Sequence, residues 1–197
     1  MHKTLETLAS VWMALSQQGA TRHSLLINLG GGMVTDLGGF AAATFKRGIS
    51  YINIPTTLLA MVDASVGGKT GINFNGLKNE IGAFAPASVV LLCGKFLQTL
   101  DQRNLLSGYA EMLKHGLISN AAHWAELLTF DMAQIDYTRL QELAGASVQV
   151  KEDIVAQDPF EKGIRKALNL GHTIGHAFES FAPVSYTHLR AHETKAN

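Results

Sequence analysis

The sequence has 197 residues, of which 47% are hydrophobic and 16% charged, and 16 basic residues balance 16 acidic ones to a formal net charge of +0. This hydrophobic share is typical of a well-buried globular chain and argues against disorder. The balanced charge gives no general attraction to nucleic acid or to anionic membranes. Cys93 is the single cysteine, so the chain has no internal disulfide, and no apolar run approaches the length of a signal peptide or a membrane span. We therefore expect a soluble cytoplasmic protein with no nucleic-acid or membrane partner.

The first half of the chain alternates between helical and strand patterns. Leu5, Leu8, Val11, Trp12 and Leu15 recur at helical spacing, which predicts an amphipathic helix to about residue 18. Short apolar runs predict buried strands over 24–29, 50–54 and 88–92, with helices over 34–45 and 58–64 and a loop over 67–79. A strand, a glycine turn, a helix and a second strand, in that order, indicate a partial Rossmann-like parallel α/β layer. We assign this α/β part to residues 1–99.

The second half is predicted to be all-helical. Helical periodicity runs through 107–119, 121–130, 137–155 and 166–181 with short polar breaks between them, so we expect a helical domain over 100–182. Residues 183–197 lack apolar periodicity, although the preceding helix should lead into more core. We interpret them as a non-native tail; the alternative is a native but frayed C-terminus.

Two glycine-rich segments of the first half are candidates for anion binding. Gly30-Gly31-Gly32 follows a predicted strand and opens a helix, where backbone amides favour phosphate oxygens. Its spacing differs from the usual dinucleotide fingerprint, so a packing turn is the alternative. Lys69 and Lys78 flank the second segment, which would let them clamp a phosphorylated substrate or a dinucleotide; the alternative is a solvated loop. Between the two segments, Pro55-Thr56-Thr57 is typical of a helix start.

The helical half contains a candidate metal site. Glu111, Lys114 and His115 are spaced i, i+3 and i+4, which places them near one face of a helix. His172 and His176 are also one turn apart on an otherwise apolar helix, and such a pair can present two nitrogens to one metal. Glu111 with His172 would give the mixed oxygen and nitrogen ligation of zinc or a similar divalent ion. Structural, buried histidines are the alternative.

Five segments, taken together and in this order, resemble the dehydroquinate synthase family. They are residues 30–40, 55–63, 67–73, 107–114 and 168–179, and the similarity extends from about His2 to Phe181. The resemblance implies a homodimeric enzyme with bound NAD and a divalent metal, zinc or cobalt. Its substrate would be a sugar phosphate, 3-deoxy-D-arabino-heptulosonate 7-phosphate, whose alcohol is oxidised transiently before phosphate is eliminated, the ketone is reduced and the ring closes by an aldol step.

The resemblance also assigns roles to individual positions. The positions that match the cofactor-binding pattern are Lys3, Gly32, Asp36, Thr56, Thr57, Lys69, Lys78 and Thr99. Glu111 and His172 match two metal ligands. The positions that match the substrate pocket and catalytic groups are Arg47, Asp63, Lys69, Asn79, Lys114, Lys151, Arg165, Asn169 and His176. In the family, the residue that matches Arg47 serves the neighbouring subunit's site.

The chain departs from the family pattern at both ends. The family has a further α/β segment before the point that matches the start of this chain. It also has a third metal ligand, in a His-Gly motif, after the helix that matches His172. In this chain Leu189 follows His188 and Glu193 follows His192, so neither histidine is assigned as that ligand. We therefore expect a chain truncated at both ends.

Three other functions remain open from the sequence. A related sugar phosphate cyclase that makes an aminocyclitol precursor shares the motifs, although the pattern at Asn79, Arg165 and Asn169 favours dehydroquinate synthase. A metal-dependent alcohol or glycerol dehydrogenase has a similar architecture, but Glu111 stands where such enzymes typically carry Asp. The non-enzyme alternative is an inactive fragment of the synthase, which the missing third ligand supports.

Overall fold

The computed structural model describes residues 3–171 of the chain, in two compact units. The first unit comprises Met1–Thr56 and Ala64–Cys93, and the second comprises Thr57–Asp63 and Gly94–Asn197. The predicted helix over 166–181 lies only partly within the described residues. His172, His176 and the predicted tail over 183–197 lie outside them. Among residues 3–171, no helix is both long and apolar enough to cross a membrane.

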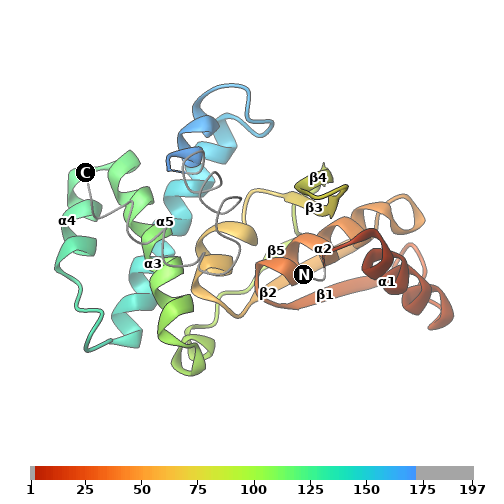
Figure 1. Ribbon diagram of the computed structural model, residues 1–197, viewed down its shortest axis with the longest axis horizontal. Coiled ribbons are helices and arrows are strands. Elements are labelled where there is room, and N and C mark those ends of the chain that lie inside the picture. Colours follow the sequence, from red (N-terminus) through yellow and green to blue (C-terminus); the bar gives the residue numbers. More distant parts are fainter. Residues whose placement is uncertain (1–2, 172–197) are drawn as a thin grey trace. The chain divides into compact units, whose positions relative to one another are not determined.

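The first unit contains a parallel sheet and an antiparallel hairpin (Figure 1). Its elements are α1 (Leu5–Gln17), β1 (Leu25–Gly30), α2 (Gly32–Thr44), a short 3₁₀ turn (Phe45–Arg47), β2 (Ser50–Pro55), β3 (Lys69–Phe74), β4 (Leu77–Phe84) and β5 (Val89–Val90). β1, β2 and β5 form the sheet in the order β1-β2-β5, with both pairs parallel. The predicted parallel α/β layer is therefore confirmed.

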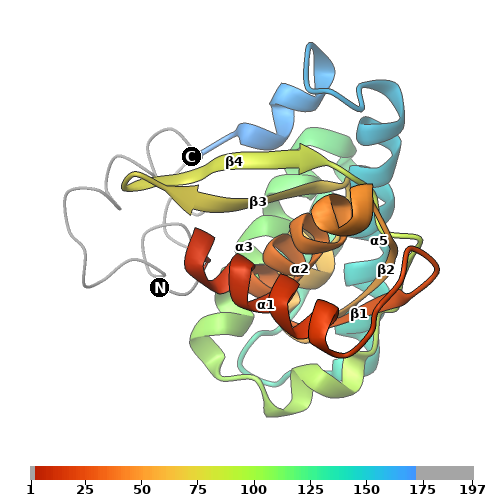
Figure 2. The ribbon, with the colours of Figure 1, turned by 90° about the vertical axis from the view of Figure 1, so that its right-hand side faces the viewer.

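α2 is the centre of the first unit, where it packs on β1, β2 and β3 (Figure 2). Its apolar side chains join residues of α1 and the strands in two buried clusters. The clusters consist of Leu8, Leu37, Phe40, Ala41 and Ile72, and of Ala42, Phe45, Ile49 and Tyr51. Each large side chain buried in this way stabilises the fold by roughly 1.5–3 kcal/mol. Two glycines let α2 approach its neighbours, because a Cβ at Gly38 would lie 2.0 Å from Asn28 Oδ1 and one at Gly39 would lie 2.5 Å from Thr70 Cγ2.

The predicted loop over 67–79 is wrong, since most of it forms the β3–β4 hairpin. β3 and β4 are antiparallel, with Ile72 opposite Ile81. Asn75 and Gly76 form the turn with φ values of 48° and 78°, and Asn-Gly is the sequence that two-residue hairpin turns prefer because both central residues need positive φ. The strands also approach closely, since a Cβ at Gly82 would lie 2.1 Å from Thr70 O.

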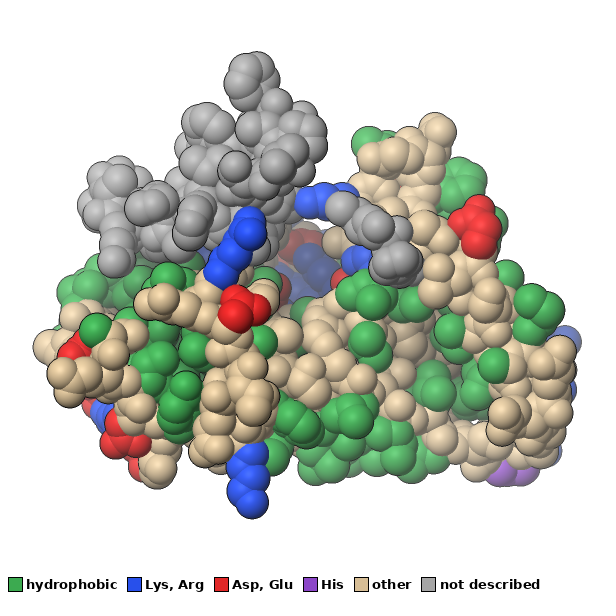
Figure 3. Space-filling model, turned by 60° about the horizontal axis from the view of Figure 1, so that its bottom comes forward, with side chains coloured by type: hydrophobic (Ala, Val, Ile, Leu, Met, Phe, Trp, Pro, Cys, Tyr) green, Lys and Arg blue, Asp and Glu red, His purple; other side chains and the backbone are tan. Residues whose placement is uncertain are grey.

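One face of the parallel sheet is uncovered within the described residues. Leu25, Ile27 and Leu29 of β1 are 51%, 55% and 56% exposed, and Val89 of β5 is 44% exposed. Asn28, the β1 residue that faces α2, is instead buried. Hydrophobic side chains also gather in patches on the face of the molecule shown in Figure 3. Because parallel sheets are normally covered on both faces, the exposed face of β1 and β5 is suited to further packing.

The second unit is helical, as predicted. Its elements are a π-helical turn (Ala60–Ala64) whose last residue belongs to the first unit, a 3₁₀ helix (Gly94–Thr99), α3 (Gln102–Ser119), α4 (Ala121–Thr129), α5 (Tyr137–Gln157) and a second 3₁₀ helix (Ile164–Asn169). Asp101, Asn120 and Asp136 cap the N-termini of α3, α4 and α5 with their side chains. α3 packs against both α4 and α5 (Figure 1).

The last predicted helix differs from the structure in its described part. An α-helix was expected to begin at residue 166, but residues 164–169 form a 3₁₀ helix that ends before Leu170. Gly171 then has a φ of 78°, a left-handed conformation that glycine adopts readily and that ends a helical turn. The remainder of this predicted helix lies outside the described residues.

Candidate active site

α3 carries a buried group of charged side chains. Glu111, Lys114 and His115 are 7%, 3% and 0% exposed. The Lys114 ammonium donates to Glu111 Oε1, and it also donates to the backbone oxygen of Leu168 at 2.6 Å. The predicted convergence of these three side chains on one face of a helix is confirmed. Charged side chains are almost never buried without partners. The two hydrogen bonds of Lys114 therefore help to stabilise this buried group of charges.

A second ion pair joins Asp63 to α5. Asp63 lies in the π-helical turn, and Lys151 is 6% exposed in α5. The Lys151 ammonium donates both to Asp63 Oδ1 and to the Asp63 backbone oxygen, the latter at 2.6 Å. A short π-helical turn often marks a functional site. Here it brings the carboxylate and the carbonyl of a single residue to one ammonium.

The surroundings of Asp63 and Glu111 shift the pKa values of the two carboxyl groups in opposite directions. Burial opposes ionisation of Asp63, but Lys151 and Lys114 outweigh it and hold the pKa of Asp63 below its ordinary value. Burial raises the pKa of Glu111 and the negative charge of Asp63 adds to this, while Lys114 partly offsets both. Opposite shifts on neighbouring carboxyl groups are typical of functional sites, since each group is then suited to a different protonation state.

Arg165 and Asn169 lie on the 3₁₀ helix after α5. Arg165 is 2% exposed, and its guanidinium donates to Pro159 O at 2.5 Å. The Asp158 carboxylate accepts hydrogen bonds from the backbone amides of Lys162, Gly163 and Arg165, which fixes the turn that carries the guanidinium. Asn169 is exposed and donates to Glu161 Oε1 at 2.8 Å.

In the first unit, three of the predicted ligand-binding residues lie together. Lys3 Nζ donates to Asp36 Oδ2 at 2.7 Å and also to Asn79 Oδ1. The backbone amide of Asn73 donates to Lys3 O at 2.9 Å, so the N-terminal segment is held against β3. The sequence suggested these residues through the resemblance alone, because nothing in their spacing indicates that they meet.

Gly32 and Thr56 lie next to the carboxyl ends of β1 and β2. Gly32 begins α2, and the Thr56 amide donates to Gly30 O at 2.9 Å. A Cβ at Gly32 would lie 3.0 Å from Ala64 Cβ, so a larger residue would be tightly packed. Ligands of parallel α/β sheets bind at the carboxyl ends of strands, which supports the predicted location of a nucleotide site. Thr57 belongs to the second unit, where its hydroxyl accepts from Ala60 N at 3.2 Å and so begins a helical turn, as predicted.

The other residues with predicted roles that lie within residues 3–171 are exposed. Arg47 has a φ of 69° in the turn after α2. Lys69 and Lys78 lie on β3 and β4, and both are exposed. Thr99 ends the first 3₁₀ helix, and its hydroxyl donates to Phe96 O at 3.4 Å. Their predicted roles in binding remain predictions.

The described residues include one of the two predicted metal ligands. Glu111 has a buried carboxylate, and both nearby donors, Lys114 and His115, approach its Oε1 atom. A carboxylate oxygen is a suitable ligand for zinc or cobalt, so Glu111 fits the expected role. No group of three His, Cys, Asp or Glu residues able to hold a metal occurs within residues 3–171, and the other predicted ligand, His172, lies outside that range.

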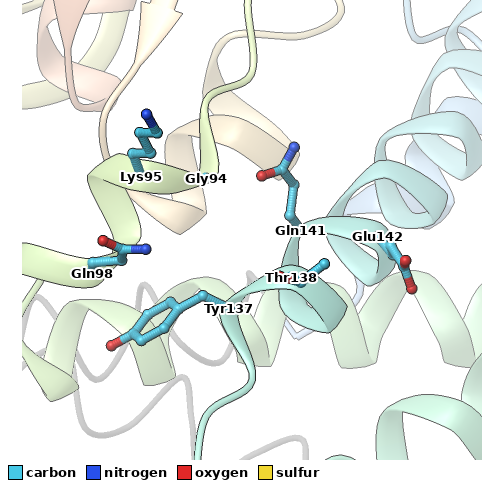
Figure 4. Close-up of a pocket in the computed structure, with 7 residues that line it drawn as sticks. All are labelled: Gly94, Lys95, Gln98, Tyr137, Thr138, Gln141 and Glu142. Atoms are coloured by element: carbon cyan, nitrogen blue, oxygen red, sulfur yellow. The ribbon is translucent and has the colours of Figure 1, made fainter.

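A separate pocket of about 360 Å³ lies between the first 3₁₀ helix and α5 (Figure 4). It is lined by Gly94, Lys95, Gln98, Tyr137, Thr138, Gln141 and Glu142. None of the residues predicted to bind cofactor, metal or substrate lines it. The buried charged residues of α3 and α5, rather than this pocket, therefore form the candidate site.

Two buried asparagines of the first unit were not identified from the sequence. Asn28 and Asn53 lie opposite each other on β1 and β2, and Asn28 Nδ2 donates to Asn53 Oδ1 at 3.0 Å. Asn53 Nδ2 donates to Ser65 O at 3.2 Å, which fixes the start of the segment that leads to Lys69. A polar residue in the middle of each apolar strand was the available signal, since buried amides need partners.

Comparison with known proteins identifies similar sequences along nearly the whole chain. Residues 1–107 match the family described as 3-dehydroquinate synthase N-terminal, and residues 108–192 match 3-dehydroquinate synthase C-terminal. A 3-dehydroquinate synthase of Parabacteroides distasonis is 64% identical over 182 residues, covering 92% of this chain and 52% of the relative. One from Pyrococcus furiosus is 44% identical, covering 95% of this chain and 55% of the relative. The chain thus spans about half the length of these relatives.

Solved structures of related cyclases have the same fold. ValA, a 2-epi-5-epi-valiolone synthase from Streptomyces hygroscopicus subsp. jinggangensis with NAD+ and Zn2+ bound, matches with a TM-score of 0.85 and 32% identity, covering 98% of this chain and 54% of that one. A 2-deoxy-scyllo-inosose synthase in complex with carbaglucose-6-phosphate, NAD+ and Co2+ also matches with a TM-score of 0.85, at 28% identity, covering 91% of this chain and 51% of that one.

Proposed function

Because this chain belongs to the 3-dehydroquinate synthase family, we propose that its residues serve the conversion of 3-deoxy-D-arabino-heptulosonate 7-phosphate to 3-dehydroquinate and phosphate. The observation that carries the proposal is the buried set of paired charges in the helical unit. One ion pair joins Lys114 to Glu111, and another joins Lys151 to Asp63. All four positions match the family's substrate and metal pattern. Perturbed carboxyl groups among buried cations are typical of catalytic sites.

The two lysines are suited to binding the anionic groups of a sugar phosphate. Among the described residues, Lys114 donates to Glu111 Oε1 and Leu168 O, and Lys151 donates to Asp63 O and Oδ1. An ammonium has three donors, so each lysine retains one donor for a phosphate or carboxylate oxygen. Arg165 would add a planar guanidinium that can bind such a group with two hydrogen bonds.

The cofactors would supply the redox and Lewis-acid parts of the reaction: NAD accepts and returns a hydride, and a divalent metal polarises an alcohol oxygen. Glu111 and His172 would hold the metal, zinc or cobalt. In the first unit, Lys3, Asp36 and Gly32 would contact NAD, together with Thr56 at the end of β2. The role of the residues is then to orient the substrate and to stabilise its negative charges, which accounts for much of the rate enhancement of such enzymes.

His176 would move protons at the substrate, and Asn79 and Asn169 would donate hydrogen bonds to its hydroxyl groups. Homodimerisation and a cytoplasmic location complete the proposal. Arg47 lies in an exposed turn of the first unit, which is consistent with a role in the neighbouring subunit's site.

The reaction can be tested in the purified chain and in a full-length chimera. In the chimera, the matched segment of this chain replaces the corresponding 182 residues of the Parabacteroides distasonis relative. Each protein is assayed with NAD, Co2+ and the heptulosonate phosphate, and phosphate release is followed alongside dehydroquinate formation. The chimera is expected to form both products in equal amounts. A folded chimera without product, beside an active relative, would contradict the proposal.

The same assay separates this function from that of the other cyclases. The chimera is offered glucose 6-phosphate in place of the heptulosonate phosphate. We expect no phosphate release from it, because the 64% identity is to a 3-dehydroquinate synthase while the two cyclase structures are 28% and 32% identical. Turnover of glucose 6-phosphate alone would reassign the chain to a different cyclase.

A further inference from the structure

His115 is a completely buried histidine to which the family resemblance gives no role. It is 0% exposed, and neither ring nitrogen has a hydrogen-bond partner among the described residues. Leaving a buried donor unpaired is unfavourable, because the hydrogen bonds that it made to water are lost without replacement. A buried and unpaired imidazole within a group of charged residues therefore requires an explanation.

The carboxylate of Glu111 is the acceptor that His115 faces. His115 follows Glu111 by one turn of α3, and its Nε2 atom lies 3.6 Å from Glu111 Oε1. Lys114 donates to the same oxygen. His115 and Lys114 thus both lie next to Glu111 Oε1. Within residues 3–171, no side chain or backbone group donates a hydrogen bond to Glu111 Oε2.

The orientation of the imidazole ring decides which of its nitrogens can donate toward Glu111. A neutral imidazole carries one N–H and one lone pair. With the proton on Nε2 the ring donates toward Glu111, whereas with the proton on Nδ1 a lone pair would face the carboxylate. The geometry therefore selects the Nε2–H tautomer.

We propose that His115 is a positioning residue, which donates its Nε2–H to Glu111 Oε1 and leaves Oε2 directed to a divalent metal. The present 3.6 Å separation is longer than a hydrogen bond, so the proposed bond requires the imidazole and the carboxylate to move closer together. Donors that hold a metal-binding side chain in one orientation commonly change metal affinity 10–100-fold when they are removed. This inference rests on the proposed metal-binding role of Glu111.

The tautomer is tested without metal, by NMR of chain labelled with ¹⁵N-histidine. Long-range ¹H–¹⁵N correlations distinguish the two neutral tautomers, and the His115→Gln variant identifies the His115 signals by their loss. We expect a neutral Nε2–H tautomer whose Nε2 and attached proton shift in the Glu111→Met variant. An Nδ1–H tautomer, or signals unchanged by Glu111→Met, would overturn the proposal.

The effect on the metal is tested by calorimetric titration of Co2+ into the wild-type chain and three variants. His115→Gln places an amide donor near the Nε2 position, His115→Asn places one near Nδ1, and His115→Leu has none. We expect affinity 10–100-fold weaker for the Leu and Asn variants, and within about threefold of wild type for the Gln variant. Equal weakening in all three variants would indicate a purely structural histidine, and unchanged affinity in His115→Leu would also overturn the proposal. A wild-type chain that binds no Co2+ would instead count against the proposed metal site, and the tautomer would still decide the role of His115.

Discussion

The Asp63–Lys151 pair offers a test of how the buried charges stabilise the helical unit. Replacing Lys151 by Met keeps the apolar stem and removes the ammonium, so the carboxylate and the backbone oxygen of Asp63 both lose their hydrogen bond to α5. Removing one partner of a buried ion pair costs about 3–5 kcal/mol. The Asp63 side chain is 33% exposed and Lys114 still acts on it, so we expect the lower end, about 3 kcal/mol.

That loss corresponds to a decrease in Tm of about 6–12 °C for a chain of this size. Urea unfolding followed by circular dichroism measures the free energy of unfolding directly. Lys166→Met, which removes an exposed lysine, is the matched control and should change stability by less than about 0.5 kcal/mol. The Asp63→Asn/Lys151→Met double variant completes the cycle that isolates the pair. A loss below about 1 kcal/mol for Lys151→Met, or a coupling near zero, would refute the reasoning.

The pH dependence of the same variant has a definite sign. In the wild-type fold the pKa of Asp63 lies below its ordinary value, so its contribution to stability is present above the unfolded pKa of about 4 and is lost as the pH falls through the lower folded value. Without Lys151, burial opposes ionisation of Asp63 with less compensation. The difference in stability between the two proteins should therefore be largest near pH 7 and should decrease as the pH falls below about 4.

Four further substitutions test the local structure within each of the two units. Gly108→Ala should destabilise by about 1–3 kcal/mol, because its Cβ would lie 2.5 Å from the backbone nitrogen of Leu59, whereas Gly145→Ala in the open middle of α5 should stabilise by about 0.5–1 kcal/mol in urea unfolding. Gly76→Ala has room for its methyl group but requires a φ of 78°, so it should cost about 1–2 kcal/mol; no cost would show that the hairpin turn is not formed. Ile27→Gln, on the uncovered sheet face, should leave the free energy of unfolding within about 0.5 kcal/mol and reduce self-association in sedimentation velocity, and a large loss of stability would show that this face is covered.

Local patterns in the sequence predicted the contacts that depend on local geometry. Glu111, Lys114 and His115 meet because a helix brings residues three and four apart to one face. The parallel order of β1 and β2 followed from a strand, a glycine turn and a helix between them. The hairpin at Asn75-Gly76 was equally local, and its turn signal was missed because the abundance of glycine and lysine suggested an irregular loop.

Contacts between distant segments could not be predicted in this way. Asp63 and Lys151 are 88 residues apart, and no periodicity relates a π-helical turn to the far end of α5. The same holds for Lys114 and Leu168 O, 54 residues apart. These pairs depend on how the helices pack, so only the family resemblance placed Asp63, Lys114 and Lys151 in one site.

The most direct test of the proposed function is the metal dependence of the full-length chimera with and without Glu111. Phosphate release from the heptulosonate phosphate is measured after chelation and again after addition of Co2+, in the chimera and in its Glu111→Gln variant. We expect Co2+ to restore the chimera's activity, while the variant remains at least about 100-fold slower at the same metal concentration. A Glu111→Gln chimera with full activity would contradict the assignment of this buried carboxylate to the metal.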